Sequence, residues 1–159
     1  MFNVILPRQV DNTYRGYKLA LWLFGLLVLM KTVISLATIF NGYTAASSAD
    51  GIPLDTFTPA SARAVVSLFA LWGLAQLMIC LLCVLLLVRY RAMVSFMFAL
   101  FLPEHLSRKL ILQIMPIDTT GAPPGYFINL GLLTLMIVGL ALSLWSKGDQ
   151  THQRKTHET

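Results

Sequence analysis

Charged residues are scarce in this chain. Lysine, arginine, aspartate and glutamate together make up 12% of its 159 residues, whereas soluble domains typically contain about 25%. Hydrophobic residues account for 57%, and the mean hydropathy is +0.71. This composition is typical of an integral membrane protein, and at this length we expect one compact domain without a separate soluble domain.

Cysteine is also rare, which limits the redox chemistry that the chain can perform. The two cysteines, Cys80 and Cys83, exclude the disulfide framework of a small secreted protein. Their C-x-x-C spacing is compatible with a reactive thiol pair. However, the sequence has no second pair to relay a disulfide, and free cysteines in apolar surroundings are usually inert. Redox function is therefore the minor interpretation of this motif.

His105 is the only histidine outside the C-terminal tail. A haem with two histidine ligands would therefore need a site shared between subunits. The sequence contains no zinc-ligand spacing, glycine-rich phosphate loop or serine–histidine–acid set. It also lacks a basic patch interleaved with aromatic residues, which argues against nucleic-acid binding. We expect no metal, no cofactor and no nucleic-acid partner.

The sequence contains long apolar runs. An α-helix needs about 20 residues to cross the hydrocarbon of a bilayer. Four segments meet this length, at about 19–40, 63–88, 92–115 and 126–145. The first exceeds the apolar core of a signal peptide, which is about 7–15 residues, so we expect it to be retained. The pattern predicts an all-α, polytopic integral membrane protein, with a four-helix transmembrane bundle over residues 19–146.

Basic residues indicate how these segments are oriented. They gather before the first segment, between the second and third, and after the fourth: Arg8, Arg15, Lys18, Arg89, Arg91, Lys147, Arg154 and Lys155. The positive-inside rule places all three groups in the cytoplasm. Segment 1–18 and the polar tail 147–159 are therefore predicted to be cytoplasmic. This N-in, C-in arrangement suits a small protein of the bacterial inner (cytoplasmic) membrane, with the lipid bilayer as its first partner.

The connections carry further signals. Arg89 to Arg91 is so short a turn that the second and third segments should form an antiparallel hairpin. Residues 41–61, rich in Gly, Ala, Ser, Thr and Pro, are expected to form a loop, and Thr58-Pro59 is a typical entry to a helix. In the fourth segment, Gly139 and Ser143 have the small-x-x-x-small spacing that permits close helix contact.

The third segment carries ionisable residues where a membrane helix should be apolar: Glu104, His105, Arg108 and Lys109. A helical projection at about 100° per residue places all four within an arc of about 140°. Each charged residue near the bilayer centre costs about 2.5–3.5 kcal/mol, and each Leu, Ile or Phe returns only about 0.3–0.6 kcal/mol. This helix should therefore insert poorly alone and needs partners. Glu104 and Arg108 have the i,i+4 spacing of an ion pair.

Two other segments bring a polar residue to the same depth. Lys31, Gln76 and Glu104 each lie roughly 18–21 Å from the cytoplasmic end of their segment, at 1.5 Å per residue. We therefore expect one polar layer in the middle of the membrane, with Trp72 packed inside the bundle. Lys109 could instead extend towards the outer interface. The predicted layer contains Lys31, Gln76, Glu104, His105, Arg108 and Lys109.

Two interpretations of this layer stay open. It either holds the helices together, or it binds an anionic lipid headgroup, a small anion or a quinone oxygen, because its cations outnumber its acid. The main hypothesis is a non-enzymatic accessory subunit or small carrier, whose partners would be other membrane subunits or further copies of itself. The alternative is a membrane enzyme or redox component acting on a lipid or quinone, with Glu104 or His105 as acid/base.

Overall fold

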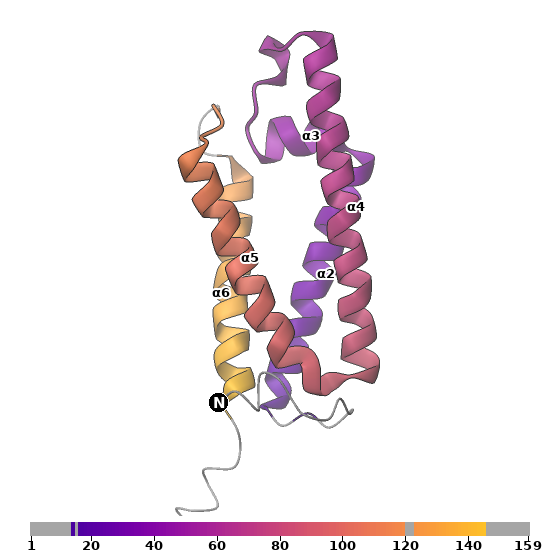
Figure 1. Cartoon of the computed structure of the whole chain (residues 1–159), viewed down its shortest axis with the longest axis vertical. Coiled ribbons are helices and arrows are strands. Elements are labelled where there is room, and N and C mark those ends of the chain that lie inside the picture. The colour runs from indigo at the N-terminus through magenta and orange to yellow at the C-terminus, as the bar shows by residue number, and fades with distance from the viewer. Residues whose placement is uncertain (1–13, 15, 120–122, 146–159) are drawn as a thin grey trace, which may run out of the picture.

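The structure, a computed structural model, describes residues 14, 16–119 and 123–145, and within them the chain is helical and contains no strand. Four helices run along the long axis of the molecule (Figure 1). They are α2 (Lys18–Phe40), α4 (Pro59–Arg89), α5 (Val94–Ile114) and α6 (Pro124–Leu144). Three of them, α2, α4 and α6, are long and apolar enough to cross a membrane. The fourth, α5, carries the charged residues of the third predicted segment.

Helices α2 and α4 pack closely against each other. At Gly73 in α4, an added Cβ would lie 3.0 Å from the backbone oxygen of Ser35 in α2, so glycine permits this approach. The predicted helix entry is found: Thr58 is the N-cap and its side chain accepts a hydrogen bond from the Ser61 backbone N–H at 3.2 Å. The helix begins at Pro59, as the Thr58-Pro59 pair predicts, four residues before the predicted start of the membrane span at about 63.

Helices α5 and α6 form the second pair. The close contact expected at Gly139 and Ser143 is present, because an added Cβ on Gly139 would collide with the ring of Phe98 in α5. One turn further along α6, the Ser143 hydroxyl hydrogen-bonds the hydroxyl of Ser95 at 2.5 Å. Tyr14 donates a hydrogen bond to the same Ser143 oxygen at 3.0 Å. Small residues of α6 therefore face the first two turns of α5.

Aromatic packing joins the two pairs. The ring of Phe24 in α2 meets the ring of Phe98 edge-on, with centroids 5.2 Å apart, and lies 6.5 Å from that of Phe101. Cys80 and Cys83 pack into the same core as free thiols with at most 1% exposure. In Figure 1, α4 and α5 meet at the end where they are connected and lie farther apart towards the other end.

The segment between α2 and α4 is folded, which differs from the expected loop. It contains α3 (Gly42–Thr44), a π-helical turn η1 (Ala45–Ala49) and a 3-10 turn η2 (Leu54–Thr56). Ala46, Ile52 and Leu54 are buried against the start of α4. This small second core explains the difference, because apolar residues without helical or strand periodicity are not visible as structure in a sequence.

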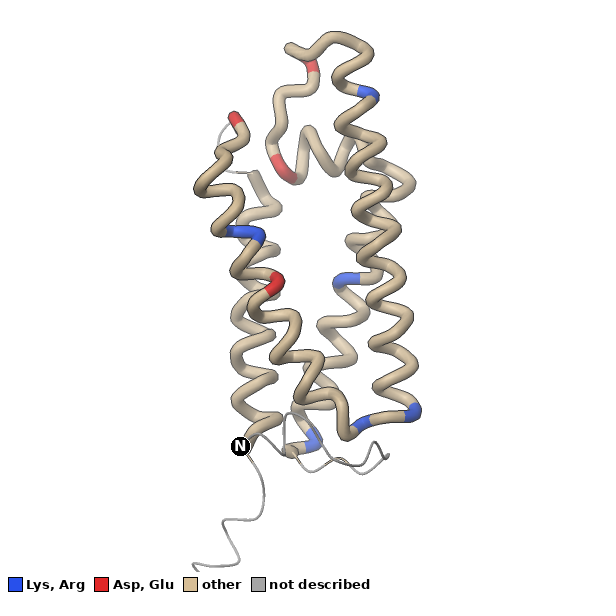
Figure 2. The backbone as a smooth tube through the Cα atoms, in the orientation of Figure 1, with Lys and Arg blue, Asp and Glu red and all other residues tan. Residues whose placement is uncertain are grey.

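Charged residues divide between the two ends of the molecule, except for a few in the middle (Figure 2). The start of α2, the end of α4 and the 3-10 turn η3 (Arg91–Met93) supply basic residues at one end. Asp50, Asp55 and Asp118 belong to the opposite end. The basic residues in segments 1–13 and 146–159, and Arg15, lie outside the described residues.

Candidate functional site

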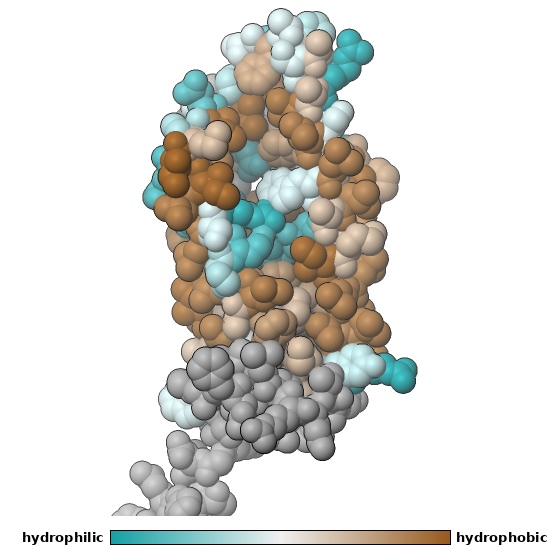
Figure 3. Space-filling model, viewed as in Figure 1, coloured by the Kyte–Doolittle hydropathy of each residue, from teal (hydrophilic) through white to brown (hydrophobic). Residues whose placement is uncertain are grey.

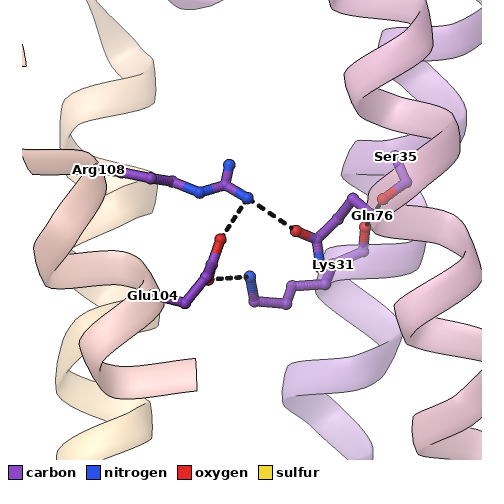
Figure 4. A network of polar contacts seen from close by, with 5 residues as sticks. All are labelled: Lys31, Ser35, Gln76, Glu104 and Arg108. Atoms are coloured by element: carbon purple, nitrogen blue, oxygen red, sulfur yellow. Dashed lines mark hydrogen bonds and ion pairs between the residues drawn. The ribbon is translucent and has the colours of Figure 1, made fainter. Parts of the chain in front are cut away.

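Three helices bring charged and polar side chains together halfway along the molecule (Figure 4). The Lys31 ammonium of α2 lies 3.7 Å from Oε2 of Glu104 in α5. Oε1 of the same carboxylate forms an ion pair with Nη2 of Arg108, one helical turn further on. Nη2 also donates a hydrogen bond to the Gln76 side-chain oxygen of α4 at 3.2 Å. We call Lys31, Gln76, Glu104 and Arg108 the polar cluster.

The local fold of α2 directs Lys31 into this cluster. Lys31, Ser35 and Thr38 share one face of the helix, and all three are at most 7% exposed. The Ser35 hydroxyl donates to the Lys31 backbone oxygen at 2.7 Å, so this polar group is satisfied inside the helix. The Lys31 ammonium also lies 4.9 Å from the centroid of the Phe101 ring, in cation–π geometry.

Trp72 belongs to the site, although the sequence predicts that it packs inside the bundle. Its ring lies 4.4 Å from the guanidinium carbon of Arg108, and its side chain is 44% exposed. The expectation of a buried Trp72 is therefore wrong. The signal that could have revealed it is its spacing, because Trp72 precedes Gln76 by one helical turn and so shares its face of α4.

Two of the six predicted site residues stand apart from the cluster. The Lys109 ammonium lies 5.9 Å from the ring centroid of Tyr126, in the first turn of α6, which fits the alternative that this side chain extends away from the layer. His105 is 6% exposed and shares the face of α5 that carries Phe98 and Phe101. Its Nε2 atom is buried and has no hydrogen-bond partner among the described residues.

Hydrogen-bond donors outnumber acceptors in the polar cluster. Two cations, Lys31 and Arg108, face a single carboxylate, Glu104, so the formal charge is one positive unit. The side-chain nitrogen of Gln76 is buried and has no partner within the described part of the chain. A buried amide N–H without an acceptor costs about 1–3 kcal/mol. Both Glu104 oxygens meet the two cations as ion pairs and make no further hydrogen bond among the described residues. The Gln76 nitrogen and one of the two positive charges therefore have no counterpart in the cluster.

The cluster reaches the surface on one side of the molecule. Figure 3 shows hydrophilic residues in a hollow of the hydrophobic surface between α5 and α4. The Glu104 and Arg108 side chains are 29% and 35% exposed, whereas that of Lys31 is 8% exposed. Their surroundings are apolar, with Leu100 exposed one turn before Glu104 on α5. We call this hollowed side of the molecule the α4/α5 face.

No family model, curated protein or solved structure matches this chain. A function must therefore be argued from the polar cluster itself. Among the described residues, no group of three or more His, Cys, Asp or Glu side chains is arranged to hold a metal ion. What the cluster offers chemically is a set of cationic and amide donors, held by three helices and open to one side.

Proposed function

We propose that this protein crosses the membrane four times, with both termini in the cytoplasm. Helices α2, α4 and α6 have the length and hydropathy of membrane spans. Helix α5 has 21 residues, as α6 has, and packs along it through Ser95 and Phe98, which supports the same depth for both helices. The basic residues at the connection of α4 and α5 support a cytoplasmic position for that end.

Within this arrangement, we propose a non-enzymatic accessory subunit that binds a transmembrane segment of a partner through the α4/α5 face. The observation that carries the proposal is a charged cluster, about one third exposed, inside an apolar surface. Hydrocarbon offers no acceptor to exposed N–H groups, and ionisable residues in membrane helices almost always face protein or water. Covering this face with another helix would remove that cost.

The depth of the cluster distinguishes a helix from lipid as the covering group. Glu104 is ten residues from either end of α5 (Val94–Ile114), which corresponds to about 15 Å on each side. The hydrocarbon core of a bilayer is about 30 Å thick. Headgroups lie outside that core, whereas a membrane-spanning segment can bring a polar side chain to its centre.

Site-specific photocrosslinking in native membranes tests this proposal. A photoreactive residue at Leu100, one turn from Glu104 and 47% exposed, should give a discrete protein adduct. The matched control is Leu29, which is 60% exposed and lies two residues from the inward-facing Lys31, on the other side of α2. Leu29 should give lipid adducts only. Lipid adducts alone at both positions would reject the accessory-subunit function.

The second candidate is a membrane enzyme or redox component that acts on a lipid or quinone. The observation that favours it is His105, whose buried Nε2 has no hydrogen-bond partner among the described residues and could bind a ligand oxygen. Native mass spectrometry of the protein in a gentle detergent separates the two. A bound quinone, haem or lipid released by His105→Ala would favour the second candidate, and a bound protein subunit the first.

A further inference from the structure

The hydrogen-bond donors of the polar cluster indicate the chemistry of the partner that would cover it. Its guanidinium has five N–H donors, yet a single nitrogen of Arg108, Nη2, makes both the ion pair with Glu104 and the hydrogen bond to Gln76. The Gln76 side chain is 8% exposed and its nitrogen has no partner within the described chain. The exposed guanidinium of Arg108 therefore has N–H groups left to donate, and the amide nitrogen of the neighbouring Gln76 is buried without an acceptor in the part of the chain that the structure describes.

The net positive charge of the cluster also favours a partner that supplies an acceptor. Lys31 makes two contacts that favour a cation, one with the Glu104 carboxylate and one with the Phe101 ring. Trp72 stacks on Arg108 and covers one side of its guanidinium, which reduces its access to water. The single carboxylate of Glu104 is shared between both cations. Of the two cations, Arg108 is the exposed one, so a group that approaches the α4/α5 face meets its guanidinium first.

A second copy of this chain is a poor occupant of the α4/α5 face. Homodimer interfaces are isologous, so each copy would present the same patch to the other. Two Arg108 and two Lys31 side chains would then meet with only two Glu104 carboxylates between them. Like charges opposed across an interface are strongly unfavourable, and more so where water is absent. The occupant must bring negative charge.

We infer that the occupant is a transmembrane helix of a different protein, which places an aspartate or glutamate at mid-membrane against Arg108. This inference rests on the proposed accessory-subunit function and adds the chemistry of the partner. A carboxylate accepts from a guanidinium in two parallel hydrogen bonds, and Arg108 is the cation of the cluster that is exposed to form them. The complex would then contain two cations and two anions.

Designed helices test the inference without changing the cluster. A tagged single-span helix of about 20 leucine and alanine residues is co-expressed with the protein, which carries the photocrosslinker at Leu100. The central residue of this probe is Asp, Asn, Leu or Lys. We expect about three- to tenfold more adduct with Asp than with Leu, the range that interhelical polar contacts support, less with Asn than with Asp, and least with Lys.

Two variants show that the preference comes from the cluster. In Arg108→Gln, the Asp probe should lose its advantage over the Asn probe, because the charge that distinguishes them is gone. In Glu104→Gln, binding of the Asp probe should rise, since the internal carboxylate no longer competes for Arg108. Adduct is normalised to the amount of folded protein, so that lower accumulation of a variant does not imitate weaker binding.

The outcomes separate this inference from the function on which it rests. A native protein adduct at Leu100, combined with equal adduct from the Asp and Leu probes, would overturn the acidic partner and leave the accessory-subunit function standing. A native adduct that contains two copies of this chain would also overturn it. Lipid adducts alone in native membranes would reject the function itself. A crosslinked partner peptide with Asp or Glu in the middle third of its span would support both.

Discussion

Arg108 is the residue on which the polar cluster depends most. It contacts Glu104 in α5, and Gln76 and the Trp72 ring in α4. Part of its side chain is also exposed at the surface. Lysine in its place would keep the charge but would lose the planar group that stacks on tryptophan and donates in two directions. The exposure of Arg108 and Glu104 also means that their pairing contributes less than that of a fully buried pair.

Removing one partner of this ion pair should destabilise the protein. Glu104→Gln or Arg108→Leu should each cost about 1–3 kcal/mol, because the remaining charge loses its hydrogen-bonded counterion in apolar surroundings. The double variant should recover part of this loss, since no unpaired charge is left. Accumulation in membranes and thermal unfolding in detergent measure the effect.

Arg63→Leu is the matched control for Arg108→Leu. Arg63 is exposed near the start of α4, where its side chain donates to the backbone oxygen of Pro59. This substitution removes the same charge far from the cluster and should leave accumulation unchanged. Normal accumulation of both single variants in the cluster would contradict the stabilising role of the pair.

At the scale of elements, the contact between α5 and α6 depends on the absence of a side chain. Gly139 faces the Phe98 ring, whereas Gly131, in the same helix, has nothing within 4 Å of an added Cβ. This pair of glycines separates the effect of packing from the effect of helix propensity, because alanine favours a helix over glycine by about 1 kcal/mol at either position.

Gly139→Ala should therefore destabilise the protein by about 1–3 kcal/mol, through displacement of Phe98 from the aromatic core. Gly131→Ala should be neutral or slightly stabilising. Unfolding of both variants in the same detergent gives the comparison. If the two substitutions had equal effects, the close approach at Gly139 would not be limiting.

The folded segment between α2 and α4 contacts α6 at the start of that helix. An added Cβ on Gly125 would lie 2.6 Å from the Ala49 backbone oxygen and 2.9 Å from Oδ1 of Asp50. Burial raises the pKa of Asp50. A carboxyl group whose pKa is higher in the folded state stabilises the fold when protonated, and this contribution is lost as the pH rises through the folded pKa.

Stability of this segment should therefore fall as the pH rises from about 4, the usual aspartate range, to the raised pKa of Asp50. Asp50→Asn should remove this dependence and make the segment more stable at neutral pH. Hydrogen exchange of the backbone amides of residues 42–58 measures both effects. Asp55→Asn is the control, because it removes a carboxylate of the same segment, retains a side-chain oxygen that can accept from the Tyr43 hydroxyl, and leaves Asp50 in place. A pH profile of Asp50→Asn identical to that of the unchanged protein would contradict the assignment.

At the scale of the whole molecule, the elements were easier to predict than their side-chain contacts. Long, mainly apolar runs indicated the four long helices to within four residues of their bounds, because a membrane span needs about 20 residues of helix. The shared depth of Lys31, Gln76 and Glu104 also followed from the regular rise of a helix. The spacing of Trp72 indicates its face of α4 but not the contact of its ring with Arg108, and two positions of Lys109 stayed open. Periodicity gives the face of a helix but not the rotamer or the neighbour of a long side chain.

The arrangement of the chain in the membrane is the remaining test at this scale. With four spans and cytoplasmic termini, a reporter enzyme active only outside the cytoplasm should be inactive when fused after residue 159. The same reporter inserted after Thr56, in the connection of α2 and α4, should be active. We expect this result because the connection of α4 and α5 is basic, and basic connections stay in the cytoplasm under the positive-inside rule.

The decisive element in this experiment is α5, whose three charged residues set it apart from the other long helices. If α5 entered and left the membrane on one side, or lay on its surface, α6 would cross in the opposite direction and the C-terminal reporter would be active. An active C-terminal fusion would thus contradict the fourth span. It would also move the polar cluster away from the membrane centre, and with it the reason for an acidic partner helix.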